Sequence, residues 1–198
     1  MSLIYFITHP EVQIDPKVPV PQWPLSEKGI DRIRLLITKN WVQKIRAIYS
    51  SSEQNRTEQK AIDCAKILGD HLYLPFTQKE EFGENDRSST GYLPKEAFET
   101  MATRFFNNPT TSVEGWERAV DAQSRIVEAV NKVMDDPSAR GDIAIVSHGG
   151  VGTLLLCYLS GSAINRSMDQ PGGGGGNVFC FEKESRTLIY NWKSIEES

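Results

Sequence analysis

The chain has 198 residues, of which 39% are hydrophobic, and a formal net charge of −4. The length predicts a single domain over residues 1–198 with a sizeable core. The mild acidity argues against nucleic acid as a partner, because nonspecific binding needs a basic face. No secretory signal and no apolar stretch of membrane-spanning length is visible, so we expect a soluble, cytoplasmic protein that does not enter a membrane.

Three scattered cysteines, Cys64, Cys157 and Cys180, follow neither a disulfide framework nor a zinc-binding spacing. All three lie in apolar or helix-patterned segments. We therefore expect buried free thiols at these positions.

Predicted strands and helices alternate along the chain. The strands are Leu3–Thr8, Ile45–Ser50, His71–Thr77 and Asp142–Ser147, followed by a hairpin of Asn177–Glu182 with Thr187–Asn191. The helices are residues 26–40, a segment that ends at Leu68 with Gly69 as its stop, Pro94–Phe106, Gly115–Met134 and Gly149–Leu159. This order predicts a layered α/β fold with a mainly parallel sheet. Asp142–Ser147 alternates weakly, which favours a central strand buried on both faces.

Two of the predicted strands deliver a histidine at their carboxyl ends, in Thr8-His9-Pro10 and in Ser147-His148-Gly149. In open α/β sheets, ligands bind in the crevice outside these ends, where separate strands pool their residues. His148 also precedes a predicted helix, whose N-terminus suits an anion. We expect the two histidines to meet.

Arg56 falls in the first turn of the second predicted helix. The helix dipole disfavours a cation there unless an anion lies nearby. Arg56 is therefore a candidate anion ligand, and a solvated surface arginine is the alternative.

Two further segments have biased composition. Residues 11–24 are rich in proline, which excludes a regular helix, and they either line a substrate cleft or form a surface connector. The run Gly172–Gly176 is either a slack loop or a source of N–H groups for an anion. Its spacing matches neither a Walker A loop nor a dinucleotide fingerprint.

Phosphoryl transfer needs a nucleophile, cations and N–H donors around the phosphoryl oxygens, and an acid for the leaving oxygen. His9, Arg56, His148 and Glu84, from the polar loop at residues 79–91, supply this mixture if they face one end of the sheet. Imidazole is a competent nucleophile at neutral pH, because its uncharged form is well populated.

Several motifs are similar to those of one family. They are the first strand with His9, residues 24–29, Ser51-Ser52 followed by Arg56, Gly115-Trp116-Glu117 with Arg125, and above all residues 146–151 around the second histidine. On these motifs the chain resembles the histidine phosphatase superfamily, with its phosphoglycerate mutase-like fold, over nearly its whole length. The resemblance implies a three-layer α/β/α sandwich that requires no metal or other cofactor.

The resemblance also implies roles. His9 is the residue phosphorylated, Arg56 and His148 bind the phosphoryl group, and Glu84 acts first as general acid and later as base. Glu81 and Asp86 are the alternatives for the acid. Arg87, Thr8 and Gly149 complete the predicted phosphate-binding set. The implied activity is a phosphatase that acts on a phosphorylated small molecule through phosphohistidine.

The chain departs from the family motif Arg-His-Gly, because it has Thr8-His9-Pro10. A charge-assisted hydrogen bond of the kind that the arginine makes is worth roughly 1.5–3 kcal/mol, and Pro10 has no N–H. We expect another cation to compensate, with Arg87 the first candidate and Arg166 the second, and the glycine run is a further source of donors.

The sequence also allows other functions to be considered. The departures favour, as an alternative, a catalytically impaired pseudoenzyme of the same fold that binds a phosphate ligand. A mutase is disfavoured because the long insertions that mutases carry are missing, and a metal hydrolase lacks any HxxxH or HExxH spacing. The sequence does not name the phosphoester, and it leaves the oligomeric state open, a homodimer included.

Overall fold

A computed structural model describes residues 2–51, 58–172 and 174–198. Within these ranges, six strands form one mixed sheet in the order β3-β2-β4-β1-β5-β6. The strands are β1 (Leu3–Thr8), β2 (Ile45–Ser50), β3 (Phe76–Gln78), β4 (Asp142–Ser147), β5 (Asn177–Glu182) and β6 (Leu188–Ser194). The first four run parallel, and β5 and β6 add the predicted antiparallel hairpin next to β1.

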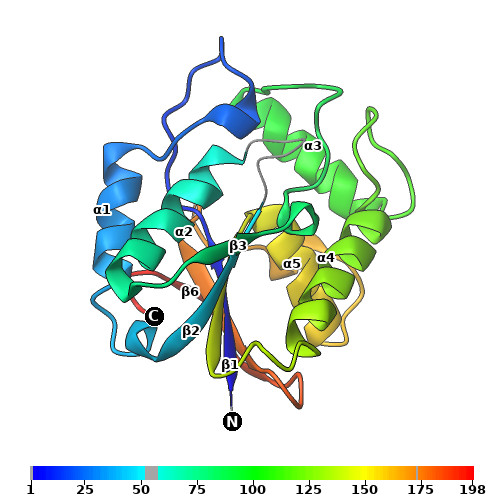
Figure 1. Cartoon of the computed structure of the whole chain (residues 1–198). Helices are drawn as coiled ribbons and strands as arrows, with labels where there is room; N and C mark the ends of the chain where they lie inside the picture. The colour runs from blue at the N-terminus through cyan, green and yellow to red at the C-terminus, as the bar shows by residue number, and fades with distance from the viewer. Residues whose placement is uncertain (1, 52–57, 173) are drawn as a thin grey trace.

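Helices cover both faces of this sheet. They are α1 (Glu27–Leu36), α2 (Gln59–Leu72), α3 (Lys95–Asn107), α4 (Ala119–Met134) and α5 (Gly149–Leu159). In Figure 1, α1 and α2 lie on one side of the sheet, and α3, α4 and α5 lie on the other. The predicted three-layer α/β/α sandwich is confirmed. Among the described residues, no helix is both long and apolar enough to cross a bilayer.

The two cores follow from the alternation of side chains along each strand. From β1, Ile4 and Phe6 pack into the cluster under α4 and α5, whereas Tyr5 and Ile7 pack into the cluster under α1 and α2. Burial of a large apolar side chain is worth about 1.5–3 kcal/mol, so both faces hold the strand in place. All six residues of β4 are buried, as its weak alternation predicted.

Three helix boundaries differ from the predictions by more than one residue. α1 ends at Leu36 rather than near residue 40, and α4 begins at Ala119 rather than Gly115, because Glu114 and Gly115 have φ values of 50° and 83° that interrupt a helix. α2 continues past Gly69 to Leu72. Here the left-handed residue that ends the helix is Tyr73, with φ of 56°.

The role of Gly69 is therefore different from a helix stop. A Cβ at this position would lie 2.7 Å from the carbonyl oxygen of Leu74, so the glycine lets the returning chain pack against the helix. Because α2 takes in His71, the third strand is reduced to Phe76–Gln78.

The start of α1 is fixed against the segment that follows His9. Ser26 caps the helix, since its Oγ accepts a hydrogen bond of 3.1 Å from the N–H of Gly29, and its own N–H donates to the carbonyl of Glu11. A Cβ on Gly29 would lie 2.2 Å from that same carbonyl oxygen. The glycine therefore permits a close backbone contact between α1 and the carboxyl end of β1.

Gly29→Ala should destabilise the fold by about 1–3 kcal/mol, because the added methyl group is forced into the Glu11 carbonyl. Without the close contact, alanine would stabilise the helix by about 1 kcal/mol. The sign of the change in the free energy of unfolding therefore tests the contact. The free energy of unfolding from urea denaturation measures it. Asp31→Ala, at an exposed position of the same helix, is the control. A Gly29→Ala protein as stable as wild type would contradict the close contact.

Candidate active site

The pairing of β1 with β4 brings the two histidines together. The strands are parallel with Thr8 opposite Ser147, and the N–H of His9 donates to the carbonyl of Ser147 at 3.2 Å. His9 and His148 therefore leave the sheet side by side at its carboxyl edge, which is the upper edge in Figure 1. Their ring centroids are 5.2 Å apart, with an interplanar angle of 68°.

The ring of His9 is held in one tautomer. Its Nδ1 lies 2.8 Å from the carbonyl oxygen of Pro10. A carbonyl can only accept, so Nδ1 carries the proton and Nε2 keeps its lone pair. Burial lowers the pKa of His9 well below its ordinary value, and the neighbouring His148 and Lys60 lower it further. At neutral pH the ring is thus uncharged, with one nitrogen able to act as a nucleophile.

His148 is 1% exposed and caps the N-terminus of α5. Burial, helped by the charge of Lys60, lowers its pKa to about 3, although Glu84 opposes the shift. Its Nε2 lies 3.4 Å from Oγ of Ser51 and 3.7 Å from Oε2 of Glu58. The neutral imidazole thus lies next to a hydroxyl group that can donate a hydrogen bond to it and next to a carboxylate that would stabilise its charged form.

The N-terminus of α5 already holds an anion, which is the carboxylate of Glu84. Its Oε2 accepts a hydrogen bond from the N–H of Gly150 at 3.1 Å, and its Oε1 accepts from the N–H groups of Val151 and Asn85 at 3.0 Å each. The sequence predicted an anion at this helix end. In the structure the protein supplies one itself.

The resting charge of Glu84 follows from these contacts. Burial raises the pKa of the carboxyl group, but Arg87, His148 and the backbone N–H donors lower it more, so the net pKa lies below the ordinary value. Glu84 is therefore ionised in the ligand-free site. A new negative charge close by would favour its protonated form.

The other two acids of the loop are placed differently. The side chain of Glu81 is 43% exposed and lies 3.8 Å from Nζ of Lys132. Asp86 accepts a hydrogen bond from the backbone N–H of Ser88, within its own loop. Of the three carboxyl groups considered, Glu84 is thus the one that contacts α5 beside His148.

The two candidate compensating cations lie apart. Nη2 of Arg87 is 3.9 Å from Oε2 of Glu84, and its guanidinium lies over the rings of Phe98 and Trp116 at 5.0 and 5.6 Å. Arg166 instead binds the outer surface of α3 through the backbone and side chains of that helix. Arg87 is therefore the one of these two arginines that lies beside the candidate site.

Arg56 lies outside the described residues, so its assignment as a phosphate ligand stays a prediction. The described residues at either end of its segment are placed, however. Ser51 and Glu58 both contact Nε2 of His148. The residues on both sides of positions 52–57 thus lie beside the same imidazole.

A buried cation that the sequence did not reveal is Lys60. Its Nζ donates to the carbonyl of Val20 at 3.0 Å and lies 3.2 Å from Oε2 of Glu58. Burial lowers the pKa of Lys60, and Glu58 opposes that effect. One signal could have identified it, since Lys60 is four residues before the buried Cys64 and therefore on the inward face of α2.

The hydroxyl group of Thr8 is bound by Gln170 and Asn177. Oγ1 donates to Oε1 of Gln170 at 2.8 Å and accepts from the N–H of Asn177 at 3.0 Å. Gly149, the first residue of α5, lies against the same glutamine, because a Cβ there would be 2.1 Å from Nε2 of Gln170. Two of the predicted phosphate ligands are thus joined by a residue that sequence analysis did not single out.

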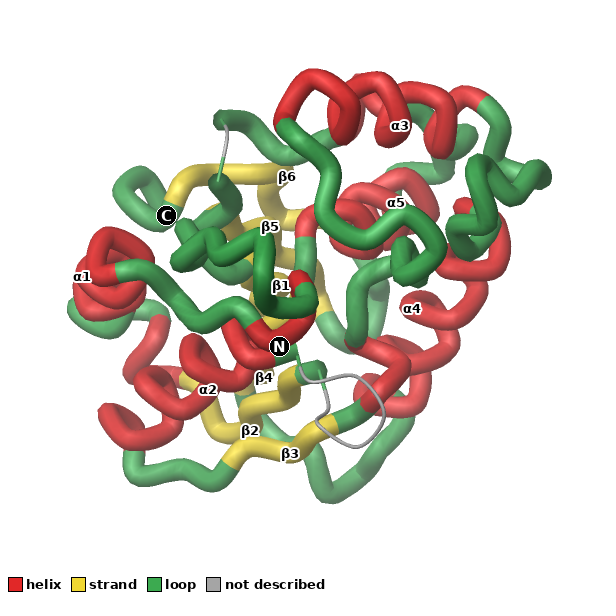
Figure 2. Tube along the Cα trace, turned by 90° about the horizontal axis from the view of Figure 1, so that it is seen from above, coloured by secondary structure: helices red, strands yellow, loops and turns green. Residues whose placement is uncertain are grey.

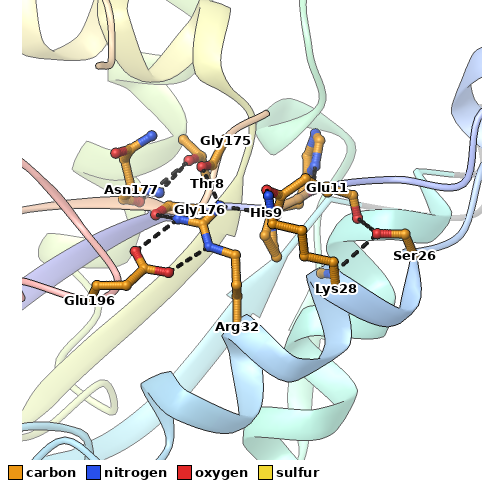
Figure 3. Close-up of polar contacts among 12 residues, drawn as sticks. Thr8, His9, Glu11, Ser26, Lys28, Arg32, Gly175, Gly176, Asn177 and Glu196 are labelled. Atoms are coloured by element: carbon orange, nitrogen blue, oxygen red, sulfur yellow. Dashed lines mark hydrogen bonds and ion pairs between the residues drawn. The ribbon is translucent and has the colours of Figure 1, made fainter. Parts of the chain in front are cut away.

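The glycine run holds the backbone of His9. The N–H of Gly176 donates to the carbonyl of His9 at 3.0 Å, as Figure 3 shows. A Cβ on Gly175, whose φ is 76°, would lie 2.0 Å from that carbonyl oxygen. Gly175 and Gly176 therefore do not form a slack loop, because they pack tightly against the chain at His9, and the N–H of Gly176 is already bound there.

Arg32 ties this contact to the rest of the protein. Its guanidinium donates to the carbonyl groups of Gly175 and Gly176 and to the carboxylates of Glu11 and Glu196 (Figure 3). Hydrogen bonds from Arg32 lower the pKa of Glu196 to about 2. One side chain of α1 thus joins the segment after His9, the glycine run and the C-terminal residues.

Figure 2 looks down onto this edge of the sheet, with α1 and α2 on one side of the strands and α3, α4 and α5 on the other. In residues 2–51, 58–172 and 174–198, no group of three His, Cys, Asp or Glu side chains could hold a metal ion. The site instead gathers two imidazoles, a carboxylate on a helix N-terminus and two buried or half-buried cations. This set suits the transfer of a phosphoryl group.

Comparisons with known proteins agree with that chemistry. Residues 4–187 match the family described as the histidine phosphatase superfamily, branch 1. No curated protein matches the chain significantly.

Solved structures share the fold. YhfR of Bacillus stearothermophilus has a TM-score of 0.73 at 22% identity, over 95% of this chain and 94% of that one. Mycobacterial glucosyl-3-phosphoglycerate phosphatase, in complex with inorganic phosphate, has 0.75 at 18% over all of both chains. The alpha-ribazole phosphatase of Shigella flexneri has 0.68 at 16%, over 99% and 98%.

Burial of neutral His148 should make the protein less stable in acid. Its pKa is about 3 in the folded chain against an ordinary value of 6.5. Between these values the unfolded chain binds a proton that the folded chain does not, so the free energy of unfolding falls as the pH falls. Calorimetry in phosphate-free buffer should show a falling Tm from pH 6.5 to about 4.5, above the range of most carboxyl groups.

His148→Gln should flatten this slope, because the titrating group is removed, while buried His9 still contributes in the same direction. His71→Gln, at an exposed position of α2, is the matched control. Equal slopes for wild type and His148→Gln would mean that His148 is not held neutral.

Proposed function

Because the chain belongs to the histidine phosphatase superfamily, branch 1, we propose that it hydrolyses a phosphorylated small molecule through a phosphohistidine formed on His9. The observation that carries the proposal is the tautomer of His9. Its Nδ1 is bound to Pro10, and Nε2 is left as a neutral nucleophile 5.2 Å, between ring centroids, from a second imidazole. The net charge of −4 favours a small molecule over nucleic acid.

In the first step, Nε2 of His9 forms a bond to phosphorus as the bond from phosphorus to the ester oxygen breaks. The transferred group is stabilised by donors and cations around its oxygens. His148 and the predicted ligand Arg56 have this role, with the charges of Lys60 and Arg87 close by. The lowered pKa of His9 supports the step, because no proton has to leave the ring first.

Glu84 supplies the proton for the leaving oxygen. It is ionised in the empty site, but a phosphate dianion bound beside it raises the pKa of the carboxyl group. The proton is therefore taken up together with the substrate. The three N–H donors on the carboxylate fix its position for the transfer.

In the second step, water attacks the phosphohistidine. The carboxylate of Glu84 takes a proton from the water as the new oxygen–phosphorus bond forms and the bond from phosphorus to Nε2 breaks. Inorganic phosphate leaves, and His9 regains its lone pair. One carboxyl group can serve both steps because it is returned to the opposite protonation state each time.

A catalytically impaired phosphate-binding protein of the same fold is the second candidate. The placement of Thr8 favours it, because the hydroxyl group is bound to Gln170 and Asn177 and offers no charge to a ligand. Against it stands the retained histidine pair with a free Nε2 on His9. Trapping of the intermediate separates the two candidates.

His9→Ala should abolish phosphatase activity, by at least about a thousandfold, because the nucleophile is removed. A panel of phosphomonoesters, assayed for released phosphate, measures the loss. Wild-type protein quenched during turnover should carry acid-labile, alkali-stable phosphate that His9→Ala lacks. If both proteins are equally inactive on every ester but bind phosphate, the second candidate replaces the enzyme.

Glu84→Gln should slow turnover by about a hundredfold to ten-thousandfold. With p-nitrophenyl phosphate, whose leaving group needs no proton, the loss should fall on the second step, so phosphohistidine should accumulate. Quenched-flow labelling detects it. Glu81→Gln is the control, since that side chain is 43% exposed and outside the proposed mechanism. A Glu84→Gln protein that hydrolyses as fast as wild type would remove Glu84 from the reaction.

A further inference from the structure

The amide of Gln170 has a defined orientation. Nδ2 of Asn177 donates to the carbonyl of Pro171 at 3.2 Å, and since a carbonyl only accepts, this atom is the amide nitrogen of Asn177. The same nitrogen donates at 3.0 Å to the side chain of Gln170, so the atom that it meets is Oε1. Thr8 donates to this oxygen too, at 2.8 Å.

The hydroxyl group of Thr8 has its proton available for that bond. Oγ1 accepts from the backbone N–H of Asn177 at 3.0 Å, and of its two nearby acceptors Oε1 of Gln170 is nearer than the carbonyl of Asn177, at 2.8 against 3.4 Å. Two donors thus converge on Oε1. The –NH₂ end of Gln170 must point the other way.

That end lies beside His148. A Cβ on Gly149 would be 2.1 Å from Nε2 of Gln170, so the amide nitrogen rests on the first residue of α5. Throughout the described part of the chain, no atom accepts a hydrogen bond from Nε2. An oriented N–H donor without a protein acceptor therefore lies against the residue that follows His148, at the N-terminus of α5.

The side chain also occupies the space that a larger residue at position 8 would need. Thr8 stands where the family resemblance implies an arginine, and its Oγ1 is already in contact with the glutamine. A guanidinium extended from this position would have to pass the amide of Gln170. The short side chain of Thr8 thus leaves a space that the side chain of Gln170 occupies.

We propose that Gln170 binds the substrate's phosphoryl group through Nε2, and that Thr8 is a positioning residue which holds the amide in this orientation. The inference rests on the proposed function and deepens it, because it assigns the donor that takes the place of the missing arginine. The donor is neutral, so the pocket contacts phosphate with one positive charge fewer than the family motif provides.

The test uses inorganic phosphate as ligand and competitive inhibitor of the full chain. Gln170→Met keeps the length of the side chain but has no donor, so phosphate should bind about tenfold more weakly or worse. The loss should appear in both the phosphate Kd from calorimetry and the inhibition constant. Gln123→Met is the matched control, because Gln123 is a half-buried amide that donates to Leu154 in α4–α5 packing.

The positioning role of Thr8 has its own readout. Thr8→Ser keeps the hydroxyl group and should bind phosphate like wild type, whereas Thr8→Val should weaken binding as much as Gln170→Met. The effects should not add in the double variant, because both act through one donor. Thermal unfolding is measured alongside, since Thr8→Val also leaves the N–H of Asn177 without its acceptor.

A rescue separates ligand binding from folding. Thr8→Arg alone should harm the protein, because the guanidinium meets Gln170. Combined with Gln170→Ala, which clears the space, it should restore phosphate affinity to the wild-type level or better. Unchanged phosphate affinity in Gln170→Met would overturn the proposal, whatever the outcome of the rescue.

The outcomes also distinguish the role of Gln170 from the proposed phosphatase activity. Active wild type with Gln170→Met unchanged in both phosphate affinity and KM overturns the role of Gln170 and leaves the phosphatase standing. Inactive wild type whose phosphate affinity depends on Gln170 supports the binding role and overturns the enzyme. Wild type that neither binds phosphate nor hydrolyses any ester overturns both.

Discussion

The site depends on the parallel pairing of β1 with β4. Register is a strict constraint, because side chains alternate between the faces of a sheet and a slip of one residue exchanges the two cores. With Thr8 opposite Ser147, the histidine that follows each strand emerges at the same level. β4 is buried on both of its faces, and Ile4 and Phe6 of β1 are buried in the core under α4 and α5. These contacts fix the register. The same strand register thus determines both the packing of the core and the relative position of the two imidazoles.

Around this pair, the described charges are arranged in local couples. Lys60 is beside Glu58 and Arg87 is near Glu84, because a buried charge without a partner is costly. A phosphate that enters the site must therefore compete with the protein's own carboxylates for its cations. Neutral donors do not carry that cost, which is a physical reason for an amide such as that of Gln170 in the proposed phosphate pocket.

Much of the architecture could be predicted because it rests on local patterns. The apolar runs of β1 and β4, and the glycines after His148, mark strand ends and a helix start without any knowledge of the rest of the chain. Gly69 was misread as a helix stop, since the same lack of Cβ that ends helices also admits a close neighbour. Which of the two applies depends on Leu74, which folding brings close.

The missed parts of the site have a common cause. Lys60 and Gln170 are polar, and polar residues are mostly exposed, so a single sequence gives no reason to place them inside. Their positions come from long-range contacts: Lys60 with Val20, and Gln170 with Thr8, 162 residues away. Glu84 is a candidate on the resemblance and on its compact loop, but its position at the N-terminus of α5 depends on tertiary contacts that the sequence spacing does not reveal.

The place of β1 in the middle of the sheet has a consequence for biosynthesis. Both of its neighbours, β4 and β5, come from the last third of the chain, and Leu3 bonds to Asp142, 139 residues further on. β1 is therefore translated long before either of its neighbours and must wait, unpaired, until residues 142–182 have been translated. Such a strand is open to association with other nascent chains in the meantime. Slow elongation or a crowded polysome should thus reduce the yield of native protein before any defect in the finished site is felt.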